Sequence, residues 1–127
     1  ASDVYKRQVQ TVPRELTKQY GIVEVNGEHE KCPTIRSIVE KPDPQVAPST
    51  MAVIGRYVLE PEIFDSLRKI DRGAGGEIQL TDAIAREIPK GKTVACKYDG
   101  ERFDCGSKQG FLNATVHYAR KEGYRII

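Results

Sequence analysis

A long apolar stretch near the middle of the chain places the strongest constraint on the fold. Residues 51–59 read MAVIGRYVL and are rich in β-branched and apolar side chains. This composition favours a buried strand that has neighbours on both sides. Missing neighbours would leave an open edge that is prone to association. We therefore expect residues 51–59 to be a central strand of a sheet.

Shorter strands and three helices are expected around this strand. The predicted strands are residues 9–12, 22–25, 34–40 and 93–98, and the predicted helices are one that Pro61 opens, residues 80–88 and residues 108–122. Asn26-Gly27 is a two-residue hairpin signal between two of these strands. The mixture indicates an α/β or an α+β class. Several strands are separated by long connections and would need partners that this chain does not supply.

Apolar faces and caps define the helices. Apolar residues share one face of the first helix at Ile63, Phe64 and Leu67, and point inward in the second at Leu80, Ala83, Ile84 and Ile88. In the third helix they recur at helical spacing, at Phe111, Leu112, Thr115, Val116 and Ala119. Thr81 or Asp82 is available to cap the second helix. Gly123 ends the third helix in the favoured way.

Composition excludes several classes of protein. The chain has 127 residues, 39% of them hydrophobic and 30% charged, which is typical of one packed domain. A net charge of +2 argues against a nucleic-acid binder, and no apolar run approaches the roughly 20 residues of a membrane span. The three cysteines, Cys32, Cys96 and Cys105, match no zinc or disulfide pattern. We interpret them as reduced thiols of a cytoplasmic protein without a secretory leader.

Two short motifs carry candidate chemistry. In FDCGSK, residues 103–108, Asp104 ends an extended segment before a glycine turn and a possible helix cap, Ser107. Backbone N–H groups gather there, which suits a metal ion held between protein and phosphate; the alternative is that Asp104 only caps the turn. In VEKP, residues 39–42, Glu40 can accept hydrogen bonds from hydroxyl groups and Lys41 can meet a phosphate. The alternative for these two is a solvated strand end.

Together these stretches resemble the sugar-phosphate nucleotidylyltransferases, and within them the bacterial UTP–glucose-1-phosphate uridylyltransferases. The resemblance rests on VEKP, on AVIGRY at 52–57, on GGEIQLTD at 75–82 and on FDCGSK, with YGIV at 20–23 also fitting. It covers residues 9–121 in the right order. It implies a transferase of carbohydrate metabolism that makes UDP-glucose and pyrophosphate from UTP and glucose 1-phosphate, and that acts as a homo-oligomer.

The resemblance also implies roles for individual residues. Gly21 and Glu40 would bind the sugar, and Lys41 would bind its phosphate and be the catalytic cation. Asp104 would hold Mg²⁺. Val53 and Tyr57 would line the sugar pocket; a role in the strand core is the alternative for both.

The chain departs from the family pattern at its start. The family begins with a strand and a glycine-rich loop that grips the triphosphate, and places a first metal-binding aspartate mid-chain; neither is present here. The resemblance therefore implies an α/β chain with a partial Rossmann-like nucleotidyltransferase fold, in which helices flank a mixed sheet and the N-terminal nucleotide-binding half is missing. Residues 1–8 would be frayed or unrelated, and residues 9–127 would be the C-terminal sugar-binding part, inactive alone. Two alternatives stay open: a piece of an adenylyl- or thymidylyltransferase for another sugar phosphate, and a non-catalytic binding or regulatory domain.

Overall fold

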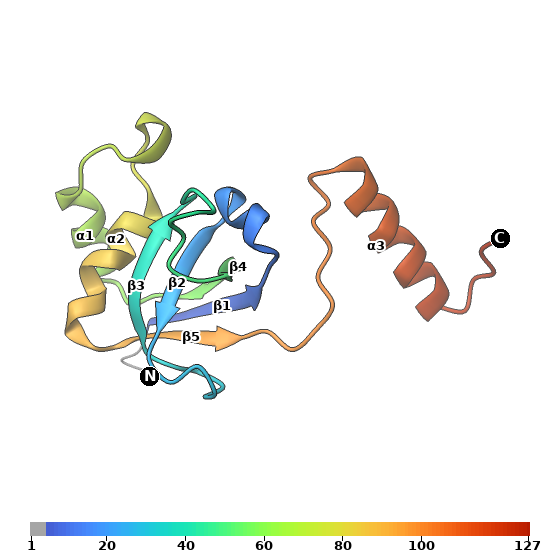
Figure 1. Cartoon of the computed structure of the whole chain (residues 1–127), viewed down its shortest axis with the longest axis horizontal. Coiled ribbons are helices and arrows are strands. Elements are labelled where there is room, and N and C mark those ends of the chain that lie inside the picture. Colours follow the sequence, from blue (N-terminus) through green and yellow to red (C-terminus); the bar gives the residue numbers. More distant parts are fainter. Residues whose placement is uncertain (1–4) are drawn as a thin grey trace.

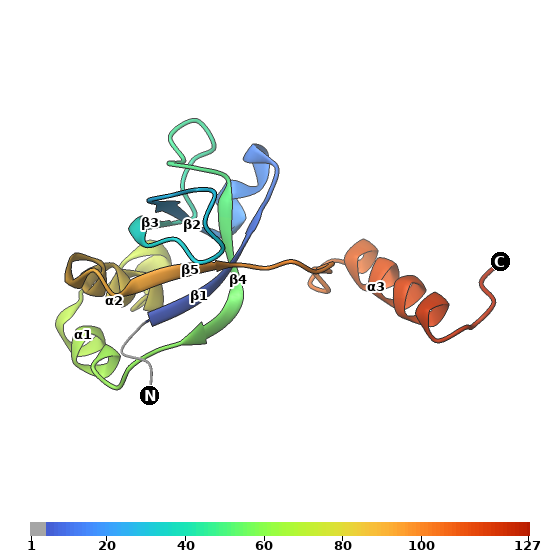
Figure 2. The same ribbon diagram turned by 90° about the horizontal axis from the view of Figure 1, so that it is seen from below.

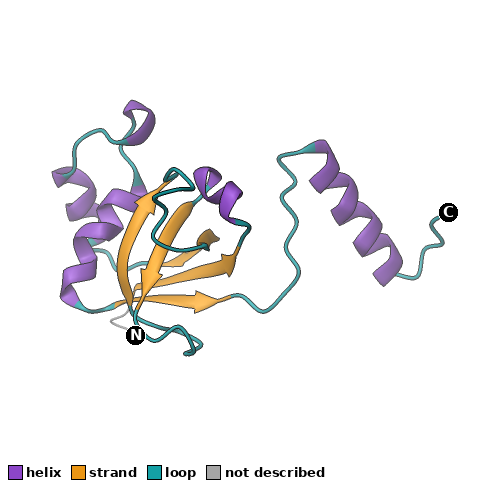
Figure 3. Cartoon of the chain, viewed as in Figure 1, coloured by secondary structure: helices purple, strands orange, loops and turns teal. Residues whose placement is uncertain are grey.

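A five-stranded mixed sheet forms the body of the chain (Figures 1 and 3). The computed structural model describes residues 5–127. The strands are β1 (Tyr5–Thr11), β2 (Gly21–Val25), β3 (Ile35–Glu40), β4 (Met51–Val58) and β5 (Thr93–Lys97). The helices are α1 (Ile63–Lys69), α2 (Leu80–Glu87) and α3 (Lys108–Lys121), with short 3-10 segments at Arg14–Gln19, Ala74–Gly76 and Ile88–Lys90. The α/β class and the mixed sheet with flanking helices are confirmed.

The apolar strand β4 lies at the centre of the sheet, as its sequence predicts. The strand order is β3-β2-β4-β1-β5, and β4 is antiparallel to both of its neighbours, whereas β5 is parallel to β1. Only the first half of β4 contains buried residues, and residues 55–58 are exposed. The expectation that the whole strand is buried is therefore wrong for its second half.

Apolar side chains cover both faces of the sheet centre. On one face Val23, Ile38 and Val53 pack with Ile88 next to α2, and α1 packs in turn on α2 (Figure 2). On the other face Ile22 packs against the 3-10 helix Arg14–Gln19. The alternation along β2 explains how neighbouring residues serve opposite faces.

The connection between β2 and β3 is longer than the Asn26-Gly27 signal predicts. The hairpin itself is confirmed, but the backbone N–H of Asn26 donates to the carbonyl of Thr34 at 2.9 Å, which encloses a loop between them. Residues 31–34 of this loop run along the outer edge of β5: Ala95 N–H donates to Pro33 at 2.8 Å, and a bridge pairs Thr34 with Val94. The loop thus joins the two edges of the sheet.

Two expectations for the helices are wrong. Phe64 of α1 is 61% exposed, whereas Ile63 beside it is buried, because α1 is only two turns long and offers α2 a narrow face. Neither Thr81 nor Asp82 caps α2, since its N-cap is Gln79. Thr81 is instead the second helical residue, and its hydroxyl points to another partner described below.

The beginning of the chain differs from expectation as well. β1 begins at Tyr5 and not at residue 9, and residues 5–8 pair with β5. They belong to the sheet and are not frayed, because β5 provides a parallel neighbour that lies about 90 residues away in sequence. Residues 1–4 lie outside the described part of the chain.

Helix α3 lies away from the sheet, at the end of the extended segment 98–107 (Figures 1 and 2). Ser107 caps it as predicted, by accepting a hydrogen bond from Gly110 N–H at 3.0 Å. Its apolar residues are not inward, since Phe111 is 63% and Leu112 53% exposed. The sequence carries the amphipathic pattern, but no residue of α3 is fully buried in the described part of the chain. No helix in residues 5–127 is long and apolar enough to cross a membrane.

Candidate functional site

The candidate site lies where β2 begins and β3 ends. Gly21 pairs with Glu40 across these strands, and the N–H of Lys41 donates to the Tyr20 carbonyl at 3.0 Å. A Cβ on Gly21 would lie 3.1 Å from Glu40 Oε2 and 3.8 Å from a methyl group of Val53. Glycine therefore leaves the space beside the carboxylate that any larger residue would take.

Helix α2 orients the Glu40 carboxylate. Thr81 Oγ1 donates a hydrogen bond to Glu40 Oε2 over 2.6 Å, and Thr81 is only 6% exposed. A short bond from a buried hydroxyl restricts the carboxylate to one orientation. A carboxylate has about four acceptor positions, so Glu40 keeps acceptor capacity for hydroxyl groups of a ligand.

A cavity of about 360 Å³ opens beside this pair. It is lined by Gln19, Tyr20, Gly21, Glu40, Val53, Ile54, Gly55, Tyr57, Gln79, Leu80, Thr81 and Arg102. The structure thus brings together four of the predicted substrate-binding residues: Gly21, Glu40, Val53 and Tyr57. A larger hollow of about 860 Å³ lies between residues 101–103 and α3, but it contains none of the candidate residues.

Lys41 lies next to the cavity but not in its lining. Its side chain is exposed, and its backbone has a positive φ of 47°. Non-glycine residues adopt this conformation rarely, and such strain is found at functional sites more often than elsewhere. The turn that follows β3 holds the backbone of Lys41 against Tyr20, which lines the cavity.

Asp104 reaches the site through Tyr20. Its Oδ2 accepts a hydrogen bond from the Tyr20 hydroxyl at 3.4 Å, and its Oδ1 accepts one from Gly106 N–H at 3.0 Å. The second contact matches the interpretation of Asp104 as a turn residue, and the first adds a link to the cavity wall. Asp104 itself is exposed, so part of its carboxylate surface is open to a ligand.

Arg102 is a cavity residue that sequence reasoning missed. Its Nη2 donates to the Tyr20 hydroxyl at 2.9 Å, and its guanidinium lies 5.2 Å from the centre of the Tyr20 ring. Its Nε is buried without a hydrogen-bond partner among the described residues. The available signal was a cation two residues before Asp104, but only the folded chain shows that Arg102 lines the same cavity as Glu40 and Thr81.

Metal-binding side chains do not cluster here. In residues 5–127 no group of three or more His, Cys, Asp or Glu side chains could hold a metal ion. A lone exposed carboxylate such as Asp104 fits one protein ligand of Mg²⁺, which commonly takes one or two carboxylates and completes its shell with phosphate oxygens and water.

Comparison with known proteins places this geometry in a family. A family model described as nucleotidyl transferase matches residues 1–121. The chain is 44% identical over 107 residues to a UTP–glucose-1-phosphate uridylyltransferase of Pseudomonas aeruginosa, covering 84% of this chain and 38% of that protein. A protein of the same name from Komagataeibacter xylinus is 51% identical over 100 residues, covering 79% of this chain and 35% of the relative.

Solved structures agree with the sequence relatives. A UDP-glucose pyrophosphorylase complexed with UDP-glucose superposes with a TM-score of 0.87 at 36% identity, over 93% of this chain and 45% of the other. A UTP-bound enzyme of this kind from Acinetobacter baumannii gives a TM-score of 0.78 at 40% identity, over 94% of this chain and 41% of the other. The chain therefore spans less than half the length of these proteins. The match of the family model over residues 1–121 shows that the chain belongs to the nucleotidyl transferase family.

Proposed function

We propose that this chain is the sugar-binding part of a UTP–glucose-1-phosphate uridylyltransferase. The observation that carries the proposal is the arrangement of Gly21, Glu40 and Thr81 in one cavity. Glu40 is oriented by Thr81 at 2.6 Å, and Gly21 leaves open space 3.1 Å from the carboxylate. A fixed carboxylate beside a glycine is suited to grip the hydroxyl groups of a sugar that approaches the backbone closely.

The reaction would be attack by a phosphate oxygen of glucose 1-phosphate on the α-phosphorus of UTP. The bond to the β-phosphate oxygen breaks, and pyrophosphate leaves. No covalent enzyme intermediate is needed, because the sugar phosphate is the nucleophile. Catalysis then comes from alignment and charge neutralisation. The interpretation of the three cysteines as reduced thiols supports a cytoplasmic location, which is part of the proposal.

The residues of this chain would divide that work. Glu40 would bind the sugar hydroxyl groups, while Val53 and Tyr57 would form the cavity wall beside the ring. Lys41 at the rim would neutralise the phosphate that is transferred. Arg102 adds a second cation to the wall of the cavity.

Asp104 would be one ligand of Mg²⁺. The ion would supply positive charge to the phosphates, and the remaining ligands would be phosphate oxygens and water. The hydrogen bond from the Tyr20 hydroxyl at 3.4 Å would keep the carboxylate facing the cavity. The full-length enzyme would be a homo-oligomer.

An NMR titration of the 127-residue chain with UDP-glucose tests the sugar site. Saturable shifts are expected at the amides of Gly21, Gly55 and Thr81, which line or flank the cavity. Glu40→Gln should weaken binding at least about tenfold, because a hydrogen bond to a charged group is lost, worth about 1.5–3 kcal/mol. Glu24→Gln is the matched control, since Glu24 lies on the same hairpin but pairs with Arg36 outside the cavity. A folded chain that gives no saturable shifts at millimolar UDP-glucose, or equal losses in both variants, would refute the proposed site.

A further inference from the structure

Two cysteines that are distant in sequence meet at the edge of the sheet. Cys32 lies in the loop between β2 and β3, and Cys96 lies in β5. Their Sγ atoms are 2.8 Å apart, although the residues are 64 positions apart in the chain. The linear spacing predicts no disulfide, because only the fold brings the two segments together.

The backbone register places the two residues directly opposite one another. Ala95 N–H donates to the Pro33 carbonyl at 2.8 Å, and Lys97 N–H donates to the Lys31 carbonyl at 3.1 Å. Cys32 and Cys96 therefore face each other between these two hydrogen bonds, in the antiparallel run that the bridge between residues 34 and 94 continues. Opposed residues at such positions have Cα atoms about 4.5 Å apart and side chains on the same face. That separation lies within the range that a disulfide spans, about 4.4–6.8 Å.

We propose that Cys32 and Cys96 form a reversible disulfide when the protein meets a small peroxide. The exposed Cys32 thiolate attacks one oxygen of hydrogen peroxide, giving a sulfenic acid, and the other oxygen leaves as water after protonation. The half-buried Cys96 thiolate then attacks that sulfur, the S–S bond forms, and a second water leaves. Two thiols lose two electrons and two protons, and one peroxide is reduced to two water molecules.

The disulfide would hold the loop between β2 and β3 covalently against β5. Residues 31–34 connect the edge strand β3 to the other edge strand, β5, by a few backbone hydrogen bonds. A covalent link between residues 64 apart restricts the unfolded chain strongly, and the expected rise in Tm is on the order of 10 °C. The sulfurs lie at the end of the hairpin opposite to Gly21 and Glu40, so this inference does not depend on the proposed function.

Peptide mapping of the oxidised 127-residue chain tests the site. Trypsin releases the cysteines in three separate peptides: residues 32–36, 93–97 and 103–108. After mild treatment with hydrogen peroxide and alkylation, peptides 32–36 and 93–97 should be joined with a loss of two hydrogens, and peptide 103–108 should be alkylated. Titratable thiols should fall from three to one, and the rise in Tm should be reversed by dithiothreitol.

Matched variants distinguish a specific disulfide between Cys32 and Cys96 from unspecific oxidation of the three thiols. Cys105→Ser should still form the cross-link and show the full rise in Tm, because Cys105 lies in the turn before α3. Cys32→Ser and Cys96→Ser should show neither, while melting near the reduced protein. The proposal would be overturned by cross-links that contain Cys105, by sulfinic acids at residues 32 and 96 without a cross-link, or by a cross-linked chain that melts with the reduced one. The comparison of oxidised and reduced wild type needs no variant to fold.

Discussion

Replacement of Ser66 by alanine should destabilise the helix pair that supports the candidate site. Ser66 lies on α1 and donates a hydrogen bond to Oε1 of Glu87 on α2. Glu87 is 2% exposed, and Lys90 Nζ is 2.5 Å from its other oxygen. Without the Ser66 hydroxyl, one side of a buried carboxylate would have lost its donor. Because α2 also carries Thr81, weaker packing of α2 should also loosen the hydrogen bond from Thr81 to Glu40.

The size of the effect follows from the charge and burial of Glu87. A hydrogen bond to a charged group contributes about 1.5–3 kcal/mol, and an unsatisfied buried acceptor costs a similar amount. We expect a loss of about 2 kcal/mol. With an unfolding entropy of about 2.1 cal/mol/K per residue, this lowers the Tm of a chain of this length by roughly 7 °C.

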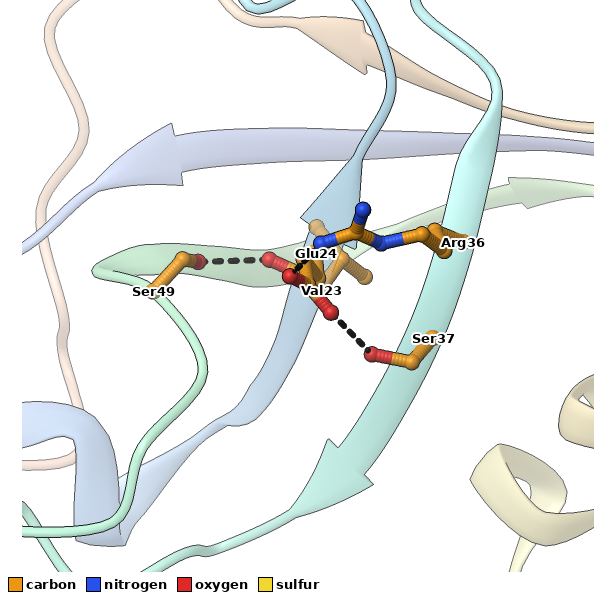
Figure 4. Close-up of polar contacts among 5 residues, drawn as sticks. All are labelled: Val23, Glu24, Arg36, Ser37 and Ser49. Carbon is orange, nitrogen blue, oxygen red and sulfur yellow. Dashed lines mark hydrogen bonds and ion pairs between the residues drawn. The ribbon is translucent and has the colours of Figure 1, made fainter.

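Urea unfolding followed by circular dichroism at pH 7 measures the free energy directly. Ser37→Ala is the matched control: Ser37 also donates to a glutamate, at 3.2 Å to Glu24, but that acid lies near the surface and pairs with the exposed Arg36 (Figure 4). Solvent can replace the Ser37 hydroxyl, so little change is expected there. Equal losses in the two variants, or a Ser66→Ala protein that melts with wild type, would refute the reasoning from burial.

The same carboxylate predicts a pH dependence. Burial acts to raise the pKa of Glu87, but the hydrogen bonds from Lys90 and Ser66, with the charges of Lys90 and Arg86, outweigh burial and leave this pKa below its ordinary value of 4.5. A lowered folded pKa means that the ionised group stabilises the fold above the unfolded pKa, and that this stability is lost as the pH falls through the folded pKa. The stability gap between wild type and Glu87→Gln should therefore be full at pH 7 and shrink below about pH 4.5. A gap that stays constant from pH 7 to pH 3 would contradict this assignment.

Three further predictions concern the site and α3. In the full-length enzyme, Lys41→Ala should mainly lower kcat, whereas Glu40→Ala should mainly raise the KM for glucose 1-phosphate. The reason is that only the lysine faces charge that redistributes in the transition state. Steady-state kinetics of both variants measure this difference. Asp104→Asn should leave the Tm unchanged, since asparagine caps as well as aspartate, yet require far more Mg²⁺ for half-maximal activity; wild-type Mg²⁺ dependence would leave Asp104 as a turn residue. Gly110→Ala would put a Cβ 1.8 Å from the backbone oxygen of Asp104, so amide exchange at the start of α3 should accelerate, while Gln109→Ala should not change it.

Local signals in the sequence were sufficient for most of the elements. The β-branched run of β4 predicted a central strand, and Ser107 predicted the cap of α3, because each depends on neighbours within a few residues. Glu40 and Gly21 were named through the family resemblance of the short motifs that contain them, and their roles stay predictions. The amphipathic pattern of α3 was also correct as a pattern, although the described residues leave its apolar face exposed.

Contacts between distant segments could not be read from the sequence. Threonine is a residue type that often caps helices, yet the hydroxyl of Thr81 donates a hydrogen bond to Glu40, 41 residues away. Arg102 enters the cavity because the segment after β5 returns to Tyr20, and no local pattern encodes that return. The expected two-residue turn at Asn26-Gly27 gave way to a longer loop for a related reason, since pairing with β5 outweighs the preference of the turn.

The sequence by itself determined the class of fold and the order of the strands and helices along the chain, which follow from periodicity and from the conformational limits of single residues. The acid, base and glycine of the proposed site were named through the family resemblance that their short motifs carry. The tertiary structure alone decided the strand order β3-β2-β4-β1-β5, the Thr81–Glu40 bond and the meeting of Cys32 with Cys96. The physical reason is that strands pair through backbone N–H and C=O groups, which are nearly the same in every residue. The partner and the register of each strand are therefore set by how side chains pack in the whole sheet.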